Sequence, residues 1–231
     1  MRDTYLGDSG FLTVAHPGTI VVDMSTVDPG TSRAVAAAGA ARGVRVLDAP
    51  VSGSSAGAIE GTLTIMVGGD ASTLEEVRST LAVMGPNVIH VGDNGAGSAL
   101  KLVNNLIAGI SMGAVAEEFA LGLKAGLDPH KMFEVISKSS GNCWNLQTRA
   151  PAAGVVPTSP ASNGYAPGFM TDLMWKDLGL AVSAGNELHV ALPLCGLAQQ
   201  WYAISSAMGH GREDFSVLGA VLQELAGLER A

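Results

Sequence analysis

The sequence has few cysteines and few positive charges. Its 231 residues include two cysteines, Cys143 and Cys195, which form no CxxC pair. They give no disulfide framework, so a reducing compartment, the cytoplasm, is the simplest expectation. Acidic residues outnumber basic ones by 21 to 13, and the net charge is −8. This balance argues against the basic surface that binds nucleic acid or an anionic membrane.

Other signals are missing as well. No run of eighteen or more apolar residues is without polar breaks, and the first residues lack the layout of a signal peptide, so no membrane span is expected. The five histidines are scattered, without a close pair, and no metal site is expected. The whole sequence is 47% hydrophobic and 15% charged, a composition typical of proteins that fold around a sizeable core.

The first part of the chain alternates apolar, β-branched runs with helical stretches. Such runs predict strands at residues 18–24, 45–49, 63–67 and 88–91. Helices are expected from residue 29 to 42 and, capped by Ser72 or Thr73, up to about residue 84. This β-α-β rhythm predicts an α/β fold with a mixed or parallel sheet covered by helices.

Helical patterns dominate after residue 92. A long apolar helix follows the glycine-rich turn at residues 92–97 and runs to about residue 125. Shorter helices are predicted at residues 129–139, 171–184, 193–208 and 214–228, with an irregular stretch at residues 141–169. We therefore expect an α/β domain over residues 1–93 and an all-helical domain over residues 94–231, joined by the long helix.

One motif of nucleotide-binding sheets is absent. A dinucleotide-binding domain normally begins with a strand, a Gly-x-Gly-x-x-Gly turn and a helix. This chain has no such fingerprint after a strand, and about four strands are too few for two mononucleotide-binding halves. The residues alone therefore do not support a nucleotide site.

The start of the long helix carries two polar side chains on one face. Lys101 lies about one turn into the helix, and Asn105 follows four residues later. Positions i and i+4 share a helix face, so an ammonium and an amide lie side by side near a tight glycine turn. A partly exposed lysine that only extends to solvent is an equally good interpretation of this stretch alone.

Two further stretches combine polar groups. Residues 48–58 lead from a strand through a proline into a loop of small residues, whose N–H groups and hydroxyls suit a carboxylate or a phosphate. An ordinary surface loop is the competing interpretation. In the helix at residues 172–178, Lys176 and Asp177 are neighbours that point to different sides, so no ion pair between them is expected.

Four ordered motifs span nearly the whole chain. They are Asp-Ala-Pro-Val-Ser-Gly at residues 48–53, Gly-x-Gly-x-x-x-Lys-x-x-Asn-Asn at residues 95–105, Ser-Ser-Gly-x-Cys-Trp at residues 139–144, and Gly-Phe-x-Thr-x-Leu-Met-x-Lys-Asp-Leu at residues 168–178. Together they resemble the β-hydroxyacid dehydrogenase family, and within it the 3-hydroxyisobutyrate dehydrogenases. The resemblance implies a partial Rossmann-type domain, an all-helical domain that forms a homodimer or homotetramer, and NAD- or NADP-dependent oxidation of a small 3-hydroxy acid.

The resemblance also implies roles for individual residues. Lys101 would be the general acid/base, and Asn105 would hold the substrate hydroxyl toward it. The other residues implied are Ser52, Gly53 and Ser54 at the substrate carboxylate, Phe169 at the substrate, Thr26 and Lys176 at the cofactor, and Trp144 and Asp177 as supports around them. For Phe169, Trp144 and Asp177, ordinary packing or helix-edge roles are equally good interpretations.

Two departures from the family pattern leave alternatives open. Ser54 stands where the family usually has glycine, and a positive φ there would strain it. The glycine-rich nucleotide loop is missing, so we expect the chain to begin inside the first domain. The alternatives are a catalytically incomplete fragment that acts as a helical dimerisation module, and a related reductase of tartronate semialdehyde or succinate semialdehyde.

Overall fold

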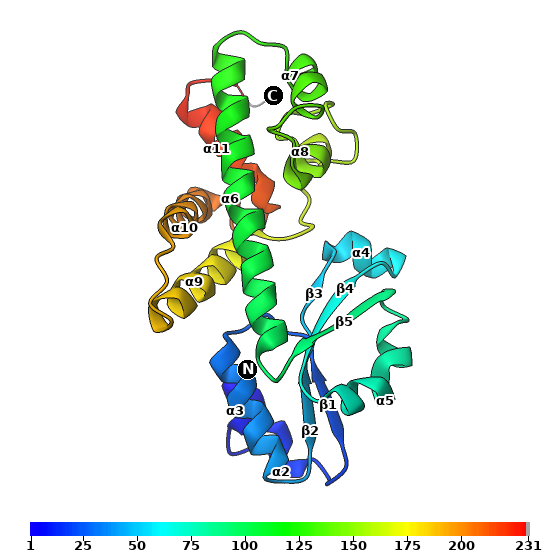
Figure 1. Cartoon of the computed structure of the whole chain (residues 1–231). Coiled ribbons are helices and arrows are strands. Elements are labelled where there is room, and N and C mark those ends of the chain that lie inside the picture. Colours follow the sequence, from blue (N-terminus) through cyan, green and yellow to red (C-terminus); the bar gives the residue numbers. More distant parts are fainter. Residues whose placement is uncertain (230–231) are drawn as a thin grey trace. The chain divides into compact units, whose positions relative to one another are not determined.

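The chain folds into two compact units that share one long helix. The structure is a computed structural model, and it describes residues 1–229. The units are Met1–Asn104, here called the sheet unit, and Asn105–Ala231, called the helical unit. Helix α6 (Ala96–Lys124) contributes to both. The predicted fold class, a partial sheet followed by an all-helical region and joined by a long helix, is confirmed (Figure 1).

The sheet unit contains one mixed sheet of five strands. They are β1 (Ile20–Asp23), β2 (Arg45–Asp48), β3 (Val51–Ser52), β4 (Thr64–Gly68) and β5 (Asn87–Gly92). β1 runs parallel to β2 and β4 runs parallel to β5, whereas β4 is antiparallel to β2 and β3. The four predicted strands are present, and β3 is an addition that the sequence pattern did not reveal because it is only two residues long.

Helices cover both faces of this sheet. They are α1 (Arg2–Leu6), α2 (Phe11–Val14), α3 (Pro29–Ala40), α4 (Ser54–Glu60) and α5 (Ala71–Leu81). Successive residues of a strand face opposite sides, so Val46 and Leu47 of β2 enter different cores. Val46 packs with Val35 of α3, and Leu47 packs with Leu74 of α5. α3 therefore covers one face and α5 the other.

Aspartates begin the two longer helices that cover the sheet. The Oδ1 atom of Asp28 accepts a hydrogen bond from the N–H of Thr31 at 2.7 Å, at the start of α3. Asp70 does the same for Thr73 at 2.7 Å, at the start of α5. The expectation that Ser72 or Thr73 caps α5 was wrong, because both hydroxyls instead donate to the Asp70 carboxylate.

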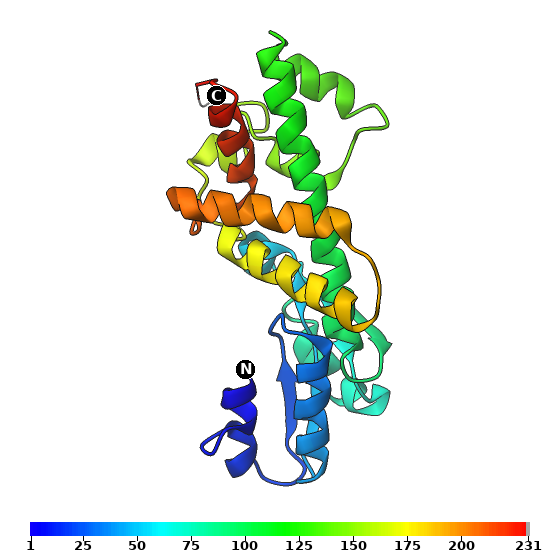
Figure 2. The same ribbon diagram turned by 90° about the vertical axis from the view of Figure 1, so that its left-hand side faces the viewer.

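The helical unit is built around buried apolar side chains. Beyond its part of α6, its α-helices are α7 (Pro129–Ile136), α8 (Trp144–Arg149), α9 (Thr171–Glu187), α10 (Pro193–Ser205) and α11 (Leu218–Leu225). α9 and α10 pack side by side (Figure 2). The Tyr202 hydroxyl of α10 donates to the Gly109 carbonyl at 2.9 Å, and burial raises the pKa of Tyr202.

The stretch predicted to be irregular is partly helical. Residues 141–169 contain α8 and a 3-10 turn at Pro160–Asn163. The turn is held by Ser159, whose Oγ accepts from the N–H of Ser162 at 3.3 Å. The abundance of proline, glycine, serine and asparagine hid these short helices, because each is only one or two turns long.

α6 is apolar enough that its length and composition alone would allow it to cross a membrane. About a third of its most apolar window (33%) is buried inside the chain. A core helix passes the same test. Met112 and Phe119 of α6 are fully buried, as expected for a helix that forms part of a core.

Candidate active site

The loop after β2 has an unusual backbone. Gly53 has φ of +139°, and a Cβ there would lie 2.8 Å from the Leu63 side chain. Ser54, the first residue of α4, has φ of +59°, a backbone region that residues other than glycine avoid. The expected strain at Ser54 is therefore present. Ser52 is held in β3, opposite Thr64 of β4. This bend brings Ser52 and the backbone N–H groups that follow it into one short turn.

A buried carboxylate binds the start of α6. The Oδ1 atom of Asp48 accepts from the Gly95 N–H at 2.7 Å, and Oδ2 accepts from the Ser98 N–H at 2.9 Å. Asp48 is the last residue of β2 and is 2% exposed. Gly95 has φ of +91°, which allows the chain to turn from β5 into the helix. Asp48 opens the Asp-Ala-Pro-Val-Ser-Gly motif, but nothing in the sequence indicates a role for it.

Lys101 and Asn105 follow on α6. Lys101 is 8% exposed and Asn105 is also buried, so the alternative interpretation, a partly exposed lysine that only extends to solvent, was wrong. Both lie on one helix, one turn apart, as the spacing predicted. Burial of an ammonium group is unfavourable without compensating contacts, so a buried lysine needs a local reason for its position.

In the helical unit, Asn105 contacts the Lys-Asp pair of α9. Its amide nitrogen donates to Asp177 Oδ2 at 2.6 Å. Lys176 Nζ lies 2.9 Å from Asp177 Oδ1, so the expectation of no ion pair between these neighbours was wrong. Adjacent positions do diverge on a helix, but the four-carbon stem of lysine is long enough to bend back. The buried Asp177 carboxylate thus holds an amide on one oxygen and an ammonium on the other.

Two of the predicted aromatic residues surround a buried ion pair. Arg149 Nε lies 3.4 Å from Asp214 Oδ1, and the guanidinium stacks 4.6 Å from the ring of Trp144. Asp214 Oδ2 accepts from the Phe169 N–H at 3.0 Å. Phe169 also makes an edge contact with Phe215 at 5.8 Å. Burial lowers the pKa of Arg149, and Asp214 offsets only part of this effect. Trp144 and Phe169 belong to the recognised motifs, whereas Arg149 and Asp214 lie outside them and were not predicted as site residues.

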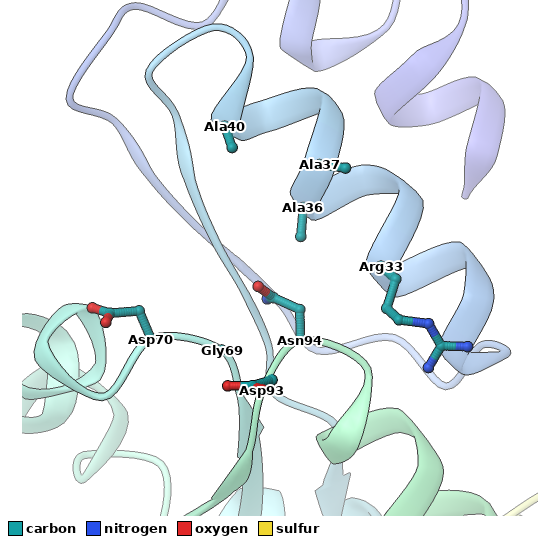
Figure 3. A pocket seen from close by; sticks show the side chains of 8 residues that line it. All are labelled: Arg33, Ala36, Ala37, Ala40, Gly69, Asp70, Asp93 and Asn94. Carbon is teal, nitrogen blue, oxygen red and sulfur yellow. The ribbon is translucent and has the colours of Figure 1, made fainter.

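A separate hollow lies on the sheet unit. It has a volume of about 480 Å³, between the alanine-rich side of α3 and the ends of β4 and β5 (Figure 3). Its lining residues are Arg33, Ala36, Ala37, Ala40, Gly69, Asp70, Asp93 and Asn94. None of the predicted site residues lines it, and among residues 1–229 no cluster of side chains suited to a metal ion is found.

Comparison with known proteins gives a consistent result for both units. Residues 1–92 match the family model for the NAD binding domain of 6-phosphogluconate dehydrogenase. Residues 95–222 match the model for the NAD-binding domain of NADP-dependent 3-hydroxyisobutyrate dehydrogenase. The two matches together cover nearly the whole chain.

Individual relatives agree. A 3-hydroxyisobutyrate dehydrogenase of Pseudomonas aeruginosa is 45% identical over 94% of this chain and 73% of its own length. An NAD-dependent L-serine dehydrogenase of the same organism is 42% identical over 96% of this chain and 75% of its own length. The solved structure of Mycobacterium tuberculosis 3-hydroxyisobutyrate dehydrogenase with L-serine has a TM-score of 0.86 at 43% identity, over 92% of this chain and 72% of that one.

The fold, the buried lysine at the start of α6 and these matches define an NAD(P)-dependent oxidoreductase with a sheet domain and a helical domain. The two Pseudomonas aeruginosa relatives are named for small hydroxy acids, 3-hydroxyisobutyrate and L-serine. The chain belongs to the 3-hydroxyisobutyrate dehydrogenase family.

The carboxyl end of β1 suits part of the cofactor. Ser25 and Thr26 follow this strand, and the Ser25 hydroxyl donates to Asp23 Oδ1 at 2.9 Å. Ligands of open α/β sheets bind at the carboxyl ends of strands. The Ser25 proton is used in its hydrogen bond to Asp23, so its oxygen remains only as an acceptor; together with the Thr26 hydroxyl and the backbone amides it forms a polar set suited to the amide and ribose groups of a nicotinamide nucleotide. Thr26, the predicted cofactor contact, lies within this set.

Proposed function

We propose that the chain catalyses the NAD(P)-dependent oxidation of a small 3-hydroxy acid, with 3-hydroxyisobutyrate, oxidised to methylmalonate semialdehyde, as the first candidate. The observation that carries the proposal is Lys101, a buried ammonium one helical turn before the buried amide of Asn105. A lysine held one turn from a substrate-binding amide can take up and return a proton, which is the task of a general acid/base.

The reaction removes two hydrogens from the alcohol. Lys101 Nζ takes the hydroxyl proton in the oxidative direction and returns it in the reverse direction. Bound NAD(P)⁺ would supply the acceptor for the hydride that leaves C3. Asn105 orients the substrate hydroxyl toward Lys101, and its own amide is fixed by the 2.6 Å hydrogen bond to Asp177. Because the proton and the hydride leave together, the rate of the chemical step depends on the position of the lysine.

Other residues bind the reactants. Ser52 and the N–H groups of Gly53 and Ser54 bind the substrate carboxylate in the bend between β3 and α4. Phe169 forms part of the pocket wall, with Trp144 supporting it from outside. Lys176 and Thr26 contact the cofactor, and Asp177 holds Lys176 in place through the 2.9 Å ion pair.

The substrate class follows from chemistry that the relatives share. 3-Hydroxyisobutyrate and L-serine are both carboxylates with a primary alcohol on the carbon next to C2. They differ only in the C2 substituent, a methyl group in one and an ammonium in the other. We therefore favour 3-hydroxyisobutyrate first and L-serine second. Turnover rates with a panel of both acids and the two semialdehydes rank the candidates.

The test is turnover of the full chain with each acid, followed through the absorbance of NADH or NADPH. Lys101→Met should lower kcat by about a thousandfold, because general acid/base catalysis typically contributes a factor of this order. Methionine fills the buried space without a charge, so the fold is retained. Lys124→Met is the matched control, since Lys124 lies on the same helix and donates to the Ala226 carbonyl at 2.7 Å.

Two results would overturn the proposal. One is absence of turnover by the unmodified chain with every member of the panel, which would favour the dimerisation module. The other is a folded Lys101→Met variant that keeps more than a tenth of the activity. Loss of activity in Lys124→Met as well would show that the assay responds to any change in α6.

The same proposal includes a homodimer or homotetramer in the cytoplasm. Large apolar side chains of the helical unit are exposed on α6, α9 and α10, namely Ile107, Trp175, Leu194 and Leu197. Large exposed apolar side chains on several helices suit a surface that is covered by a second copy of the chain. Light scattering of the purified chain measures its mass directly, and a monomer at micromolar concentration would contradict this part of the proposal.

A further inference from the structure

The start of α6 is bound by a residue distant in sequence. α3, α5 and α7 each begin at an aspartate that accepts the N–H three residues further on: Asp28, Asp70 and Asp128. For α6, the carboxylate at Gly95 and Ser98 comes instead from Asp48 in β2, 47 and 50 residues earlier. The first turn of α6 is therefore fixed to the sheet by a side chain and not only by the local chain.

The Asp48 carboxylate is buried and accepts hydrogen bonds from two N–H groups at the start of α6. N–H groups at a helix start carry partial positive charge, and an anion there is stabilised by the helix dipole. Ser98 is fully buried, and its hydroxyl lies 2.8 Å from that of Ser32 on α3. Charge-assisted hydrogen bonds of 2.7 and 2.9 Å to two backbone N–H groups leave little freedom for the helix start.

The backbone around this contact admits no extra atoms. A Cβ on Gly97 would lie 2.4 Å from the Met66 carbonyl oxygen and 2.5 Å from that of Asp48. A Cβ on Gly68 would lie 2.7 Å from Asp48 Oδ1. Helix α6 therefore packs directly against the backbone of β2 and β4, and Asp48 lies at the centre of this contact.

Asp48 is also linked to both parts of the proposed site that lie in the sheet unit. Ser52 follows it by four residues, through Pro50, and Lys101 follows Ser98 by three. We propose that Asp48 is a positioning residue that fixes the positions of Lys101 and the Ser52 loop relative to each other. This inference rests on the proposed role of Lys101. Asp48 touches neither reactant; it acts through the backbone of α6.

Asp48→Asn is the direct test. The amide has nearly the same shape, but it offers one acceptor to two N–H donors and turns its NH₂ group toward one of them. We expect kcat to fall about 10- to 100-fold, the effect of a small displacement of a catalytic group. The KM for NAD(P)⁺ should stay within twofold. The primary deuterium isotope effect with the C3-deuterated acid should rise, because the chemical step becomes slower.

Asp70→Asn is the matched control. Asp70 performs the same capping chemistry at α5, in the same unit, at the same 2.7 Å distance, but α5 carries no proposed catalytic residue. A purely structural role for Asp48 predicts that both variants lose activity only in proportion to their loss of stability. A wild-type kcat in folded Asp48→Asn, or an equal fall of kcat in Asp70→Asn, would overturn the inference.

Amide hydrogen exchange gives a readout that does not depend on activity. The N–H groups of Gly95 and Ser98 should exchange faster in Asp48→Asn than in the unmodified chain, while those at the start of α5 should not. Unchanged exchange would contradict the inference even if the unmodified chain proved inactive, which by itself would count only against the proposed function. If Asp48→Asn does not fold, Asp48→Glu decides the question, since it keeps the charge and moves it by one methylene; wild-type kcat in that variant would overturn the inference.

Discussion

The sheet unit and the helical unit each bind one part of α6 through a buried aspartate, but they bind different groups. In the sheet unit, Asp48 accepts from two backbone N–H groups at the start of the helix. In the helical unit, Asp177 accepts from the side chain of Asn105 and pairs with Lys176. The first arrangement fixes where the helix begins, and the second fixes the direction of a side chain.

The same contrast extends to packing. The sheet unit brings backbones into direct contact, with glycine at the points of closest approach, Gly68 and Gly97. The helical unit buries a charged pair, Arg149 and Asp214, among aromatic rings. Gly97 is therefore a place that is sensitive to added volume, whereas the Arg149–Asp214 pair is sensitive to lost charge compensation. Substitutions at these two places test the contrast.

The largest effect is expected from Arg149→Met. It removes the cation and leaves the fully buried Asp214 carboxylate without its ion-pair partner, while its hydrogen bonds from Ser216 and Phe169 remain. Breaking a buried pair on one side typically costs about 4 kcal/mol. Thermal unfolding should show a midpoint several degrees lower. Arg45→Met is the control, because the Arg45–Glu76 pair is exposed, and it should leave the midpoint nearly unchanged. Equal effects of the two substitutions would remove the distinction between buried and exposed pairs here.

A smaller loss is expected from Gly97→Ala in the sheet unit. Its new Cβ would lie within 2.5 Å of two carbonyl oxygens, both in backbone that cannot turn away. Overpacking of this kind costs about 2 kcal/mol. Gly113→Ala, on the same helix but in the helical unit, meets no atom within 4 Å and should stabilise by up to about 1 kcal/mol through helix propensity. Urea unfolding of both variants measures the difference. Stabilisation by Gly97→Ala would show that α6 does not pack as closely as described.

Local chemistry explains why much of the fold could be predicted from the sequence. The β-branched runs gave four strands, and Pro29, Pro129 and Pro193 marked the starts of three helices. Five short elements, β3, α1, α2, α4 and α8, were missed because elements of two to seven residues leave no clear periodic pattern. The predicted loop at residues 48–58 is therefore helical from Ser54 onward. The spacing of Lys101 and Asn105 on one helix was also predictable, since it depends only on local geometry.

Contacts between distant residues were not predictable in this way. Nothing near residue 48 in the sequence indicates that Asp48 would bind the backbone at residues 95 and 98, and the Arg149–Asp214 pair depends on the tertiary packing of several helices. Lys176 and Asp177 were misjudged because backbone direction was used alone, whereas lysine has several rotatable bonds. Residue type and spacing identified candidates; the partners that hold them came only from the structure.

The smallest effect concerns the one place where the sheet unit bears strain in the proposed site. Ser54 has φ of +59°, and Ser54→Gly relieves this strain but adds flexibility to the unfolded chain, so a net gain of about 0.5 kcal/mol is expected. Ser55→Gly, one residue further into α4, has no strain to relieve and should lose about as much through helix propensity. The backbone N–H groups of the loop remain in Ser54→Gly, so the KM for the hydroxy acid should change little. A large rise in KM would mean that the Ser54 hydroxyl itself binds the substrate carboxylate, and that the strain is retained to place it there.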